Sequence, residues 1–341
     1  MASKNDKIRP GDSRVESKFI EVDGHKWHYL ESLPQGQAKG TILLVHGFPD
    51  LSLAWRYQIP FLVGLGYRTL ALDCMGYGKT GYSPDLKSYG FRTHADVIAA
   101  IAKQLGTSQL ILGGHDWGGA VVYRVAHWYP QLVSAVFSIA TPYSAISSTF
   151  YPTEALVKTK LPNFGYQLQL GSEEGVMESA IGSDEKLVEK FLNGMYGGRT
   201  SSGGVFMTPE KGINLGILKD DRVGKTPLLD EEELAFYTSS FKQNPIRGPM
   251  NWYRTRKVNF DDELEIPEAQ KHRLEMPVLF VQAAKDNVLI PAMSQGMEKF
   301  IPNLTRGEVP TGHWALWQAP EKVNEIVGEW LTRLDKEKSH L

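Results

Sequence analysis

Three residues at the ends of predicted strands have the side chains of a catalytic triad. Asp116 stands at the centre of Gly114-His115-Asp116-Trp117-Gly118-Gly119, between an apolar run and a run with helical spacing. Asp286 follows the apolar run 277–283, and His313 follows the run 305–309. A Gly-x-nucleophile-x-Gly motif between a strand and a helix is typical of a sharp turn that exposes a nucleophile. The pattern predicts covalent catalysis by Asp116, with His313 as a base that Asp286 orients.

Asp116 has a second interpretation, because aspartate is common at the N-cap of a helix. The order of the three residues along the chain favours catalysis. Nucleophile, acid and histidine follow one another in this order in α/β-hydrolases, with the acid and the histidine each after a later strand. We therefore expect Asp116 to be a nucleophile and not only a helix cap.

A carboxylate nucleophile suits a different electrophile from the serine that often occupies such a turn. The carboxylate of Asp116 is ionised at neutral pH and needs no base, so His313 is free to activate water in a second step. Attack on an sp3 carbon gives an ester that water can cleave, whereas a serine would be left as an inert ether. Aspartate therefore favours epoxides or alkyl halides as substrates and argues against carboxylic esters.

These residues need a scaffold, and short apolar runs alternate with helical patterns at both ends of the chain. This alternation is typical of an α/β fold with a mostly parallel sheet flanked by helices. The predicted strands are 41–45, 67–72, 109–112, 135–140, 277–283 and a more polar edge strand at 305–309. Helical spacing covers 96–105, 119–128 and 323–334, and Thr93 with Asp96 fits a capping box.

The alternation stops between about residues 143 and 273, where helical patterns and a Gly-rich stretch at 197–204 replace it. Strand-like runs resume at Pro277, so this segment reads as an insertion after one strand of the sheet. The predicted organisation is a hydrolase core formed by 1–142 and 274–341, with a helical cap domain at 143–273. We expect this cap to cover the carboxyl ends of the strands, where open α/β sheets bind ligands.

A glycine-rich motif after the second strand suggests a nucleotide site, but its context does not support one. Gly76-Tyr77-Gly78-Lys79-Thr80-Gly81 fits the dinucleotide pattern, yet Pro84 disfavours helix at Ser83, just where a helix should begin. The embedded Gly-Lys-Thr lacks the first glycine of a phosphate loop, because Asp73 stands there. The motif predicts a tight loop, and no cofactor is expected.

Metal and thiol chemistry are also not expected. The nine histidines lack ligand spacing, and His25 and His28 have no cluster of carboxylates or thiolates beside them. The single cysteine, Cys74, cannot close an intramolecular disulfide. The sequence therefore predicts neither a metal site nor a fold that needs an oxidising compartment.

Charge and length exclude further classes. The 341 residues carry 37 basic and 39 acidic side chains, a net charge of −2 without the basic excess typical of nucleic-acid binding. The longest uncharged stretch, 127–153, is broken by three prolines, so no membrane span is predicted. The N-terminus lacks the apolar segment of a secretory signal, which predicts a cytoplasmic protein. Ser339-His340-Leu341 varies the Ser-Lys-Leu peroxisomal address, so recognition by the peroxisomal import receptor is left open.

From about Phe19 to Leu334 the chain resembles the soluble epoxide hydrolases of the α/β-hydrolase superfamily. The resemblance rests on five segments. These are His46-Gly47-Phe48-Pro49, Trp55-Arg56-Tyr57-Gln58-Ile59-Pro60, the turn at 114–119, Phe164-Gly165-Tyr166-Gln167-Leu168 and Arg247-Gly248-Pro249-Met250-Asn251-Trp252-Tyr253-Arg254. The Gly-rich stretch 197–204 departs from the family pattern. The resemblance implies epoxide hydrolysis to vicinal diols, with a small apolar epoxide and water as the reactants.

The resemblance also implies a role for each site residue. Tyr166 and Tyr253 would hold and protonate the epoxide oxygen, and tyrosine suits this task because it stays protonated at neutral pH. The backbone N–H groups of Phe48 and Trp117 would form the oxyanion hole. Side chains expected to contact substrate are those of Tyr166, Gln167, Trp117 and Phe48.

Three alternatives remain at this point. A haloalkane or haloacid dehalogenase also uses an aspartate, but commonly has a second halide donor, such as asparagine where Phe48 stands, and does not need the two tyrosines. An epoxide-opening cyclase of natural-product biosynthesis would replace water by an internal hydroxyl. A ligand-binding relative would keep the fold without turnover, although the complete set of Asp116, Asp286 and His313 argues against it. The physiological substrate and the oligomeric state are not specified by the sequence.

Overall fold

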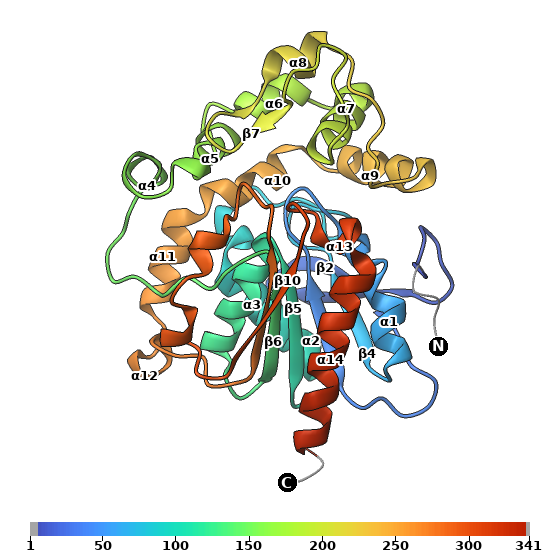
Figure 1. The fold of residues 1–341 in the computed structure, drawn as a ribbon, viewed down its shortest axis with the longest axis vertical. Coiled ribbons are helices and arrows are strands. Elements are labelled where there is room, and N and C mark those ends of the chain that lie inside the picture. The colour runs from blue at the N-terminus through green and yellow to red at the C-terminus, as the bar shows by residue number, and fades with distance from the viewer. Residues whose placement is uncertain (1–5, 339–341) are drawn as a thin grey trace.

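The computed structural model describes residues 6–338, which form an eight-stranded sheet with helices on its faces (Figure 1). The strand order is β1-β2-β4-β3-β5-β6-β9-β10. The pairs β1–β2 and β2–β4 are antiparallel, and the other neighbours are parallel. The bounds are β1 (Glu16–Val22), β2 (His25–Ser32), β3 (Thr41–Val45), β4 (Arg68–Leu72), β5 (Leu110–His115), β6 (Val133–Ile139), β9 (Val278–Ala283) and β10 (Leu304–Val309).

The six predicted strands are confirmed, and the central ones are fully buried because helices cover both faces of a parallel sheet. β10, with its polar and half-exposed side chains, lies at the edge as predicted. The helices around these strands are α1 (Gln58–Gly64), α2 (Phe91–Gln104), α3 (Trp117–Trp128), α13 (Ala315–Gln318) and α14 (Pro320–Lys338).

The predicted capping box of Thr93 and Asp96 is wrong. Helix α2 begins five residues earlier than expected, at Phe91. The N–H of Phe91 donates to the side-chain oxygen of Asn259, 2.8 Å away, so a residue distant in sequence supplies the cap. Thr93 donates instead to the carbonyl oxygen of Lys87, and Asp96 pairs with an arginine of its own helix.

The segment between β6 and β9 is largely helical, as expected. It contains α4 (Thr153–Thr159), α5 (Tyr166–Leu170), α6 (Val176–Ile181), α7 (Glu185–Met195), α8 (Leu215–Asp220), α9 (Glu231–Gln243), α10 (Arg247–Asn251), α11 (Arg256–Leu264) and α12 (Glu268–Lys271), with a small hairpin of β7 (Met207–Thr208) and β8 (Gly212–Ile213). Figure 1 shows α5–α9 as a layer across one end of the sheet, whereas α11 and α12 run beside α3. The boundaries of a separate cap domain stay a prediction.

No helix within residues 6–338 is long and apolar enough to cross a membrane. The tripeptide Ser339-His340-Leu341, considered above as a peroxisomal address, lies outside the described residues.

The glycine motif at 76–81 forms a loop, as predicted, and this loop surrounds a buried carboxylate. Asp73 is 3% exposed and accepts hydrogen bonds from Ser52 N–H at 2.8 Å, His28 Nδ1 at 2.7 Å and Lys79 N–H at 3.1 Å. A Cβ atom on Gly78, where φ is +49°, would stand 2.2 Å from Asp73 Oδ2. The glycine is therefore needed for close approach to Asp73 rather than to a phosphate.

Asp73→Asn is expected to destabilise the fold by about 2–4 kcal/mol, because an amide has one acceptor oxygen for three donors and loses the charge facing His28. Burial raises the pKa of Asp73, but the two histidines, His28 first, and the Ser52 N–H bond together outweigh burial and bring the pKa to about 2. This contribution to stability is thus present above the ordinary pKa of 3.8 and is lost as the pH falls toward 2. Urea unfolding at pH 7 measures the difference.

Asp85→Asn is the matched control, since Asp85 is exposed and accepts from Lys87 N–H with an oxygen that asparagine keeps. We expect it to change stability by less than about 0.5 kcal/mol. Equal effects of the two substitutions would contradict the role assigned to Asp73.

Candidate active site

Asp116 stands on a sharp turn between β5 and α3. Its backbone has φ +53° and ψ −125°, a conformation that residues with a side chain rarely adopt. The neighbouring glycines allow the turn, since a Cβ atom on Gly118 would lie 2.0 Å from the carbonyl oxygen of Val45. Although Asp116 occupies the N-cap position, its side chain makes no capping hydrogen bond. The carboxylate therefore points away from the helix and is available for chemistry.

The structure brings the three triad residues together. His313 Nδ1 lies 2.7 Å from Asp286 Oδ2, and His313 Nε2 lies 3.4 Å from Asp116 Oδ2. Asp286 Oδ1 accepts the N–H groups of Val288 and Leu289. Asp286 is thus fixed by backbone donors on one oxygen and faces the imidazole with the other, which is the geometry of an orienting acid.

Burial and charge act in opposite directions on these groups. Burial raises the pKa of Asp116, but the two histidines, His313 first, and the Phe48 N–H bond together outweigh burial and hold the pKa below its ordinary value. Burial lowers the pKa of His313, but the two carboxylates, Asp286 first, outweigh burial and raise it well above its ordinary value. In the resting state the site therefore contains an ionised Asp116 beside an imidazolium.

The predicted oxyanion donors differ in what they contact. Phe48 N–H donates to Asp116 Oδ1 at 2.7 Å, and a Cβ atom on the preceding Gly47 would clash with Asp116 at 2.3 Å. Trp117 begins α3 directly after Asp116, but within residues 6–338 its N–H makes no hydrogen bond to that carboxylate. One of the two predicted donors thus already holds the carboxylate, whereas the other does not.

The two predicted tyrosines lie next to each other and line the same cavities as Asp116. The ring of Tyr166, at the start of α5, is 5.7 Å from the ring of Tyr253, which lies in a short 3-10 turn at Trp252–Arg254. Tyr253 packs edge to face on Phe48 and Trp117. Burial is the main cause that raises the pKa of both phenols. The second cause is electrostatic repulsion, from Asp116 for Tyr166 and from Tyr166 for Tyr253. Both are therefore proton donors at neutral pH.

Gln167 has an orienting contact. Its Nε2 donates to the hydroxyl oxygen of Tyr166 at 3.3 Å, so the hydrogen atom of that hydroxyl is free to point elsewhere. The side chain also lines a cavity beside Asp116. This position agrees with the predicted substrate contact without testing it.

Two cavities meet at Asp116, Tyr166 and Tyr253. The first, of about 670 Å³, is also lined by Phe48, His313 and the Gly-rich stretch of the helical segment. The second, of about 460 Å³, is lined by Trp117, Gln167 and the apolar side chains of residues such as Phe91, Phe164 and Leu289. The Asp116 carboxylate and the two phenols therefore border the same pair of largely apolar cavities.

His115 is a residue of the site that the sequence analysis did not single out. Its Nε2 lies 2.9 Å from the carbonyl oxygen of His313, and the two rings are 5.0 Å apart. Burial lowers the pKa of His115 to about 4, so the ring is neutral and donates to that carbonyl. His115 therefore supports the loop that carries His313. Its place inside the turn motif, next to Asp116, was the available signal.

Within residues 6–338 no group of three or more His, Cys, Asp or Glu side chains is arranged to hold a metal ion. His28 is instead paired with Asp73, and its Nε2 lies 3.1 Å from Ser17 Oγ.

Known proteins share both this fold and this sequence pattern. The alpha/beta hydrolase fold family matches residues 40–174 and 210–320. The unmatched interval contains the Gly-rich stretch that departs from the family pattern. The chain is 37% identical to the epoxide hydrolase srdG of Neurospora crassa, over 96% of this chain and 98% of that protein.

Two further relatives agree. The chain is 35% identical to bifunctional epoxide hydrolase 2 of Rattus norvegicus over 93% of its own length, and it spans about half of that longer protein, 55%. The structure of an epoxide hydrolase from an endophytic Streptomyces matches with a TM-score of 0.80 and 25% identity, over 95% of this chain and 97% of that one. The chain therefore belongs to the epoxide hydrolases of the α/β-hydrolase fold.

Proposed function

We propose that the protein converts epoxides to vicinal diols through a covalent ester on Asp116. One observation carries the proposal: the Asp116 carboxylate on its turn faces the same cavities as the two buried phenols of Tyr166 and Tyr253. A nucleophile and two proton donors that border one cavity match the needs of ring opening, in which one carbon is attacked while charge develops on oxygen.

In the first step Asp116 Oδ2 attacks an epoxide carbon from the side opposite the ring oxygen. Oδ2 is assigned because Oδ1 is already bound to Phe48 N–H. The C–O bond of the ring breaks, and the oxygen takes a proton from Tyr166 or Tyr253. The product is a hydroxyalkyl ester of Asp116, and the resulting phenolate is reprotonated before the next turnover.

In the second step His313 takes a proton from water, and the hydroxide formed attacks the carboxyl carbon of Asp116. Oδ1 becomes the oxyanion, with Phe48 N–H as its donor and Trp117 N–H as a second donor once the intermediate forms. Collapse of the tetrahedral intermediate releases the diol and restores the carboxylate.

The charge on His313 changes between these steps. While Asp116 is ionised, its charge helps to keep His313 protonated. Esterification removes that charge, so the pKa of His313 falls and the imidazole can lose its proton to act as a base. Formation of the ester therefore favours the neutral imidazole that the second step needs.

Product analysis tests the proposal against a dehalogenase. We expect diol from styrene oxide and no halide from chloro- or bromoalkanes, since Phe48 offers no side-chain donor for a halide and the two phenols suit an alkoxide. Halide release without diol would overturn the proposal. Release of a cyclic ether from an epoxide with an internal hydroxyl would favour the cyclase instead.

Removing the phenolic hydroxyls should slow ring opening. Tyr166→Phe and Tyr253→Phe are each expected to lower the rate of ester formation by about 10- to 100-fold, and the double variant by at least about 10³-fold, because one donor partly substitutes for the other. Single-turnover kinetics with an acid quench measures the step. Tyr129→Phe, which removes the hydroxyl bonded to Asp96 on α2, is the control and should keep the wild-type rate.

An outcome in which both tyrosine variants form ester at the wild-type rate would contradict the assignment of proton donors. A small apolar epoxide is the proposed substrate, because apolar side chains dominate both cavities. Cytosolic or peroxisomal location stays a prediction, which a fluorescent fusion with and without Ser339-His340-Leu341 would test.

A further inference from the structure

The loop that follows β3 is held by two tyrosines from the helical segment. The hydroxyl of Tyr196, directly after α7, donates to the carbonyl oxygen of Pro49. The hydroxyl of Tyr237, on α9, donates to Asp50 Oδ1 at 2.7 Å. Both tyrosines and Asp50 are 0% exposed. The two residues that the tyrosines contact, Pro49 and Asp50, directly follow Phe48, whose N–H binds Asp116 Oδ1.

The loop is also held at its start, where Cys74 N–H donates to His46 Nε2 at 3.1 Å, and the ring of Phe48 packs edge to face on Phe191 and Tyr253. Residues 46–51 form no regular strand or helix, and proline has no N–H with which to bond at position 49. Asp50 Oδ1 also accepts Leu51 N–H at 2.8 Å, so the carboxyl joins the loop to α9 and to its own backbone. The direction of Phe48 N–H therefore depends in part on contacts made across the boundary between core and helical segment.

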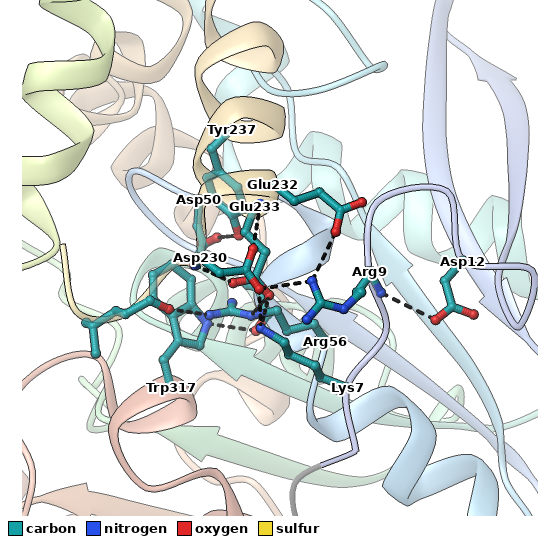
Figure 2. Close-up of polar contacts among 12 residues, drawn as sticks. Lys7, Arg9, Asp12, Asp50, Arg56, Asp230, Glu232, Glu233, Tyr237 and Trp317 are labelled. Carbon is teal, nitrogen blue, oxygen red and sulfur yellow. Dashed lines mark hydrogen bonds and ion pairs between the residues drawn. The ribbon is translucent and has the colours of Figure 1, made fainter. Parts of the chain in front are cut away.

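Helix α9 is itself anchored beside this loop (Figure 2). Glu233, one turn before Tyr237, lies 3.0 Å from the Nε of Arg56 and 2.6 Å from Lys7 Nζ. Arg56 is buried, and its guanidinium donates to the carbonyl oxygen of Leu228 and packs over Trp317. Removal of one partner from a buried charge pair is strongly destabilising, so this cluster holds α9 in place beside the loop.

The end of α7 also contacts the loop of the histidine. The indole Nε1 of Trp314 donates to the carbonyl oxygen of Met195 at 3.0 Å, and its ring lies 4.9 Å from that of Tyr196. Trp314 follows His313 directly. Adjacent residues at one helix end thus reach both the oxyanion loop and the loop of the general base.

We propose that Tyr196 and Tyr237 are positioning residues that hold Phe48 N–H on Asp116 Oδ1, so that the helical segment controls hydrolysis of the ester as well as opening of the ring. The proposal rests on the ester mechanism above. Donor geometry at an oxyanion must be held within a few tenths of an ångström, and a short loop without regular structure needs outside contacts to achieve this.

The two steps should respond differently to a weakened Phe48 donor. In the resting enzyme Phe48 N–H stabilises negative charge on Oδ1, and this charge is lost when the ester forms. In the second step charge returns to the same oxygen. A weakened donor therefore leaves ester formation unchanged or slightly faster and makes ester hydrolysis slower.

The experiment measures both rate constants in the full-length protein by acid quench and intact-protein mass spectrometry, with styrene oxide as the probe. Tyr196→Phe and Tyr237→Phe each remove one hydroxyl and keep the ring. We expect each to slow ester hydrolysis by about tenfold, with ester formation within twofold of wild type, so that the ester accumulates during turnover.

Three further variants separate positioning from stability. Tyr67→Phe is the matched control, because Tyr67 OH also donates to an aspartate, Asp335 Oδ1 at 2.6 Å, but at the opposite end of β4 from the site. It should change neither rate constant. Asp50→Asn keeps an acceptor for Tyr237 and should retain ester hydrolysis, whereas Asp50→Ala should lose it to the same extent as Tyr237→Phe.

Equal loss in both steps, or no change in either, would overturn the positioning role while leaving the ester mechanism intact. If wild type forms diol without any ester, the proposed function itself fails. The two failures are therefore distinguishable in the same data. Loss of ester hydrolysis in Tyr67→Phe would show that the effect reflects stability and would also overturn the inference.

Discussion

Asp116→Ala is expected to lower epoxide turnover by at least about 10⁴-fold and to form no covalent adduct. The methyl side chain has no nucleophile, and the remaining phenols and His313 cannot form the ester that the second step needs. Mass spectrometry of the intact protein after mixing with excess epoxide should show only the unmodified chain. Diol formation within tenfold of wild type would mean that water attacks the epoxide directly.

The backbone of Asp116 provides a second measurement on the same residue. With φ +53° and ψ −125°, alanine is strained at this position and glycine is not. Asp116→Gly should therefore be as inactive as Asp116→Ala but more stable to urea, by about 1 kcal/mol or more. Loss of activity without loss of stability would assign the effect to chemistry rather than folding.

His313→Gln should form the ester and then stop. Ring opening needs only the Asp116 carboxylate and the phenols, whereas ester hydrolysis needs a base. We expect a burst of one equivalent of epoxide consumed and a protein mass increased by one substrate, with hydrolysis slowed by about 10²- to 10⁴-fold. Rapid mixing followed by an acid quench separates the burst from later turnover.

Asp286→Asn is the companion variant, because it keeps the acceptor toward Val288 and Leu289 but loses the charge facing His313. Its ester should also accumulate, but we expect the rate of ester hydrolysis to fall less than in His313→Gln. Failure of His313→Gln to form any ester would contradict the assignment of His313 to the second step alone.

The meeting of Asp116, Asp286 and His313 could be predicted because each follows a parallel strand, and the carboxyl ends of parallel strands meet at one edge of the sheet. Apolar runs at 41–45 and 277–283 gave β3 and β9 almost without error. The first two strands were missed, although Asp23-Gly24 between them is a strong hairpin signal. Both turn residues have positive φ, as such a turn requires.

The contacts around the oxyanion loop could not be predicted from the sequence. Tyr196 and Tyr237 are two of 14 tyrosines, and their partners lie 147 and 187 residues earlier in the chain. The prediction of the cap of α2 was wrong for the same reason, since the capping residue Asn259 belongs to the helical segment. The spacing of residues along the sequence identifies candidate catalytic side chains, but it carries no signal for distant side chains that hold a loop in place.

A single turnover in water labelled with oxygen-18 tests the covalent ester most directly. Enzyme in excess over epoxide limits each molecule to one reaction, after which the diol and the peptide containing Asp116 are analysed by mass spectrometry. Because water attacks the carboxyl carbon, the label is expected in the carboxylate of Asp116, and the first-turnover diol should carry none. Label in that diol, with an unlabelled Asp116, would contradict the mechanism.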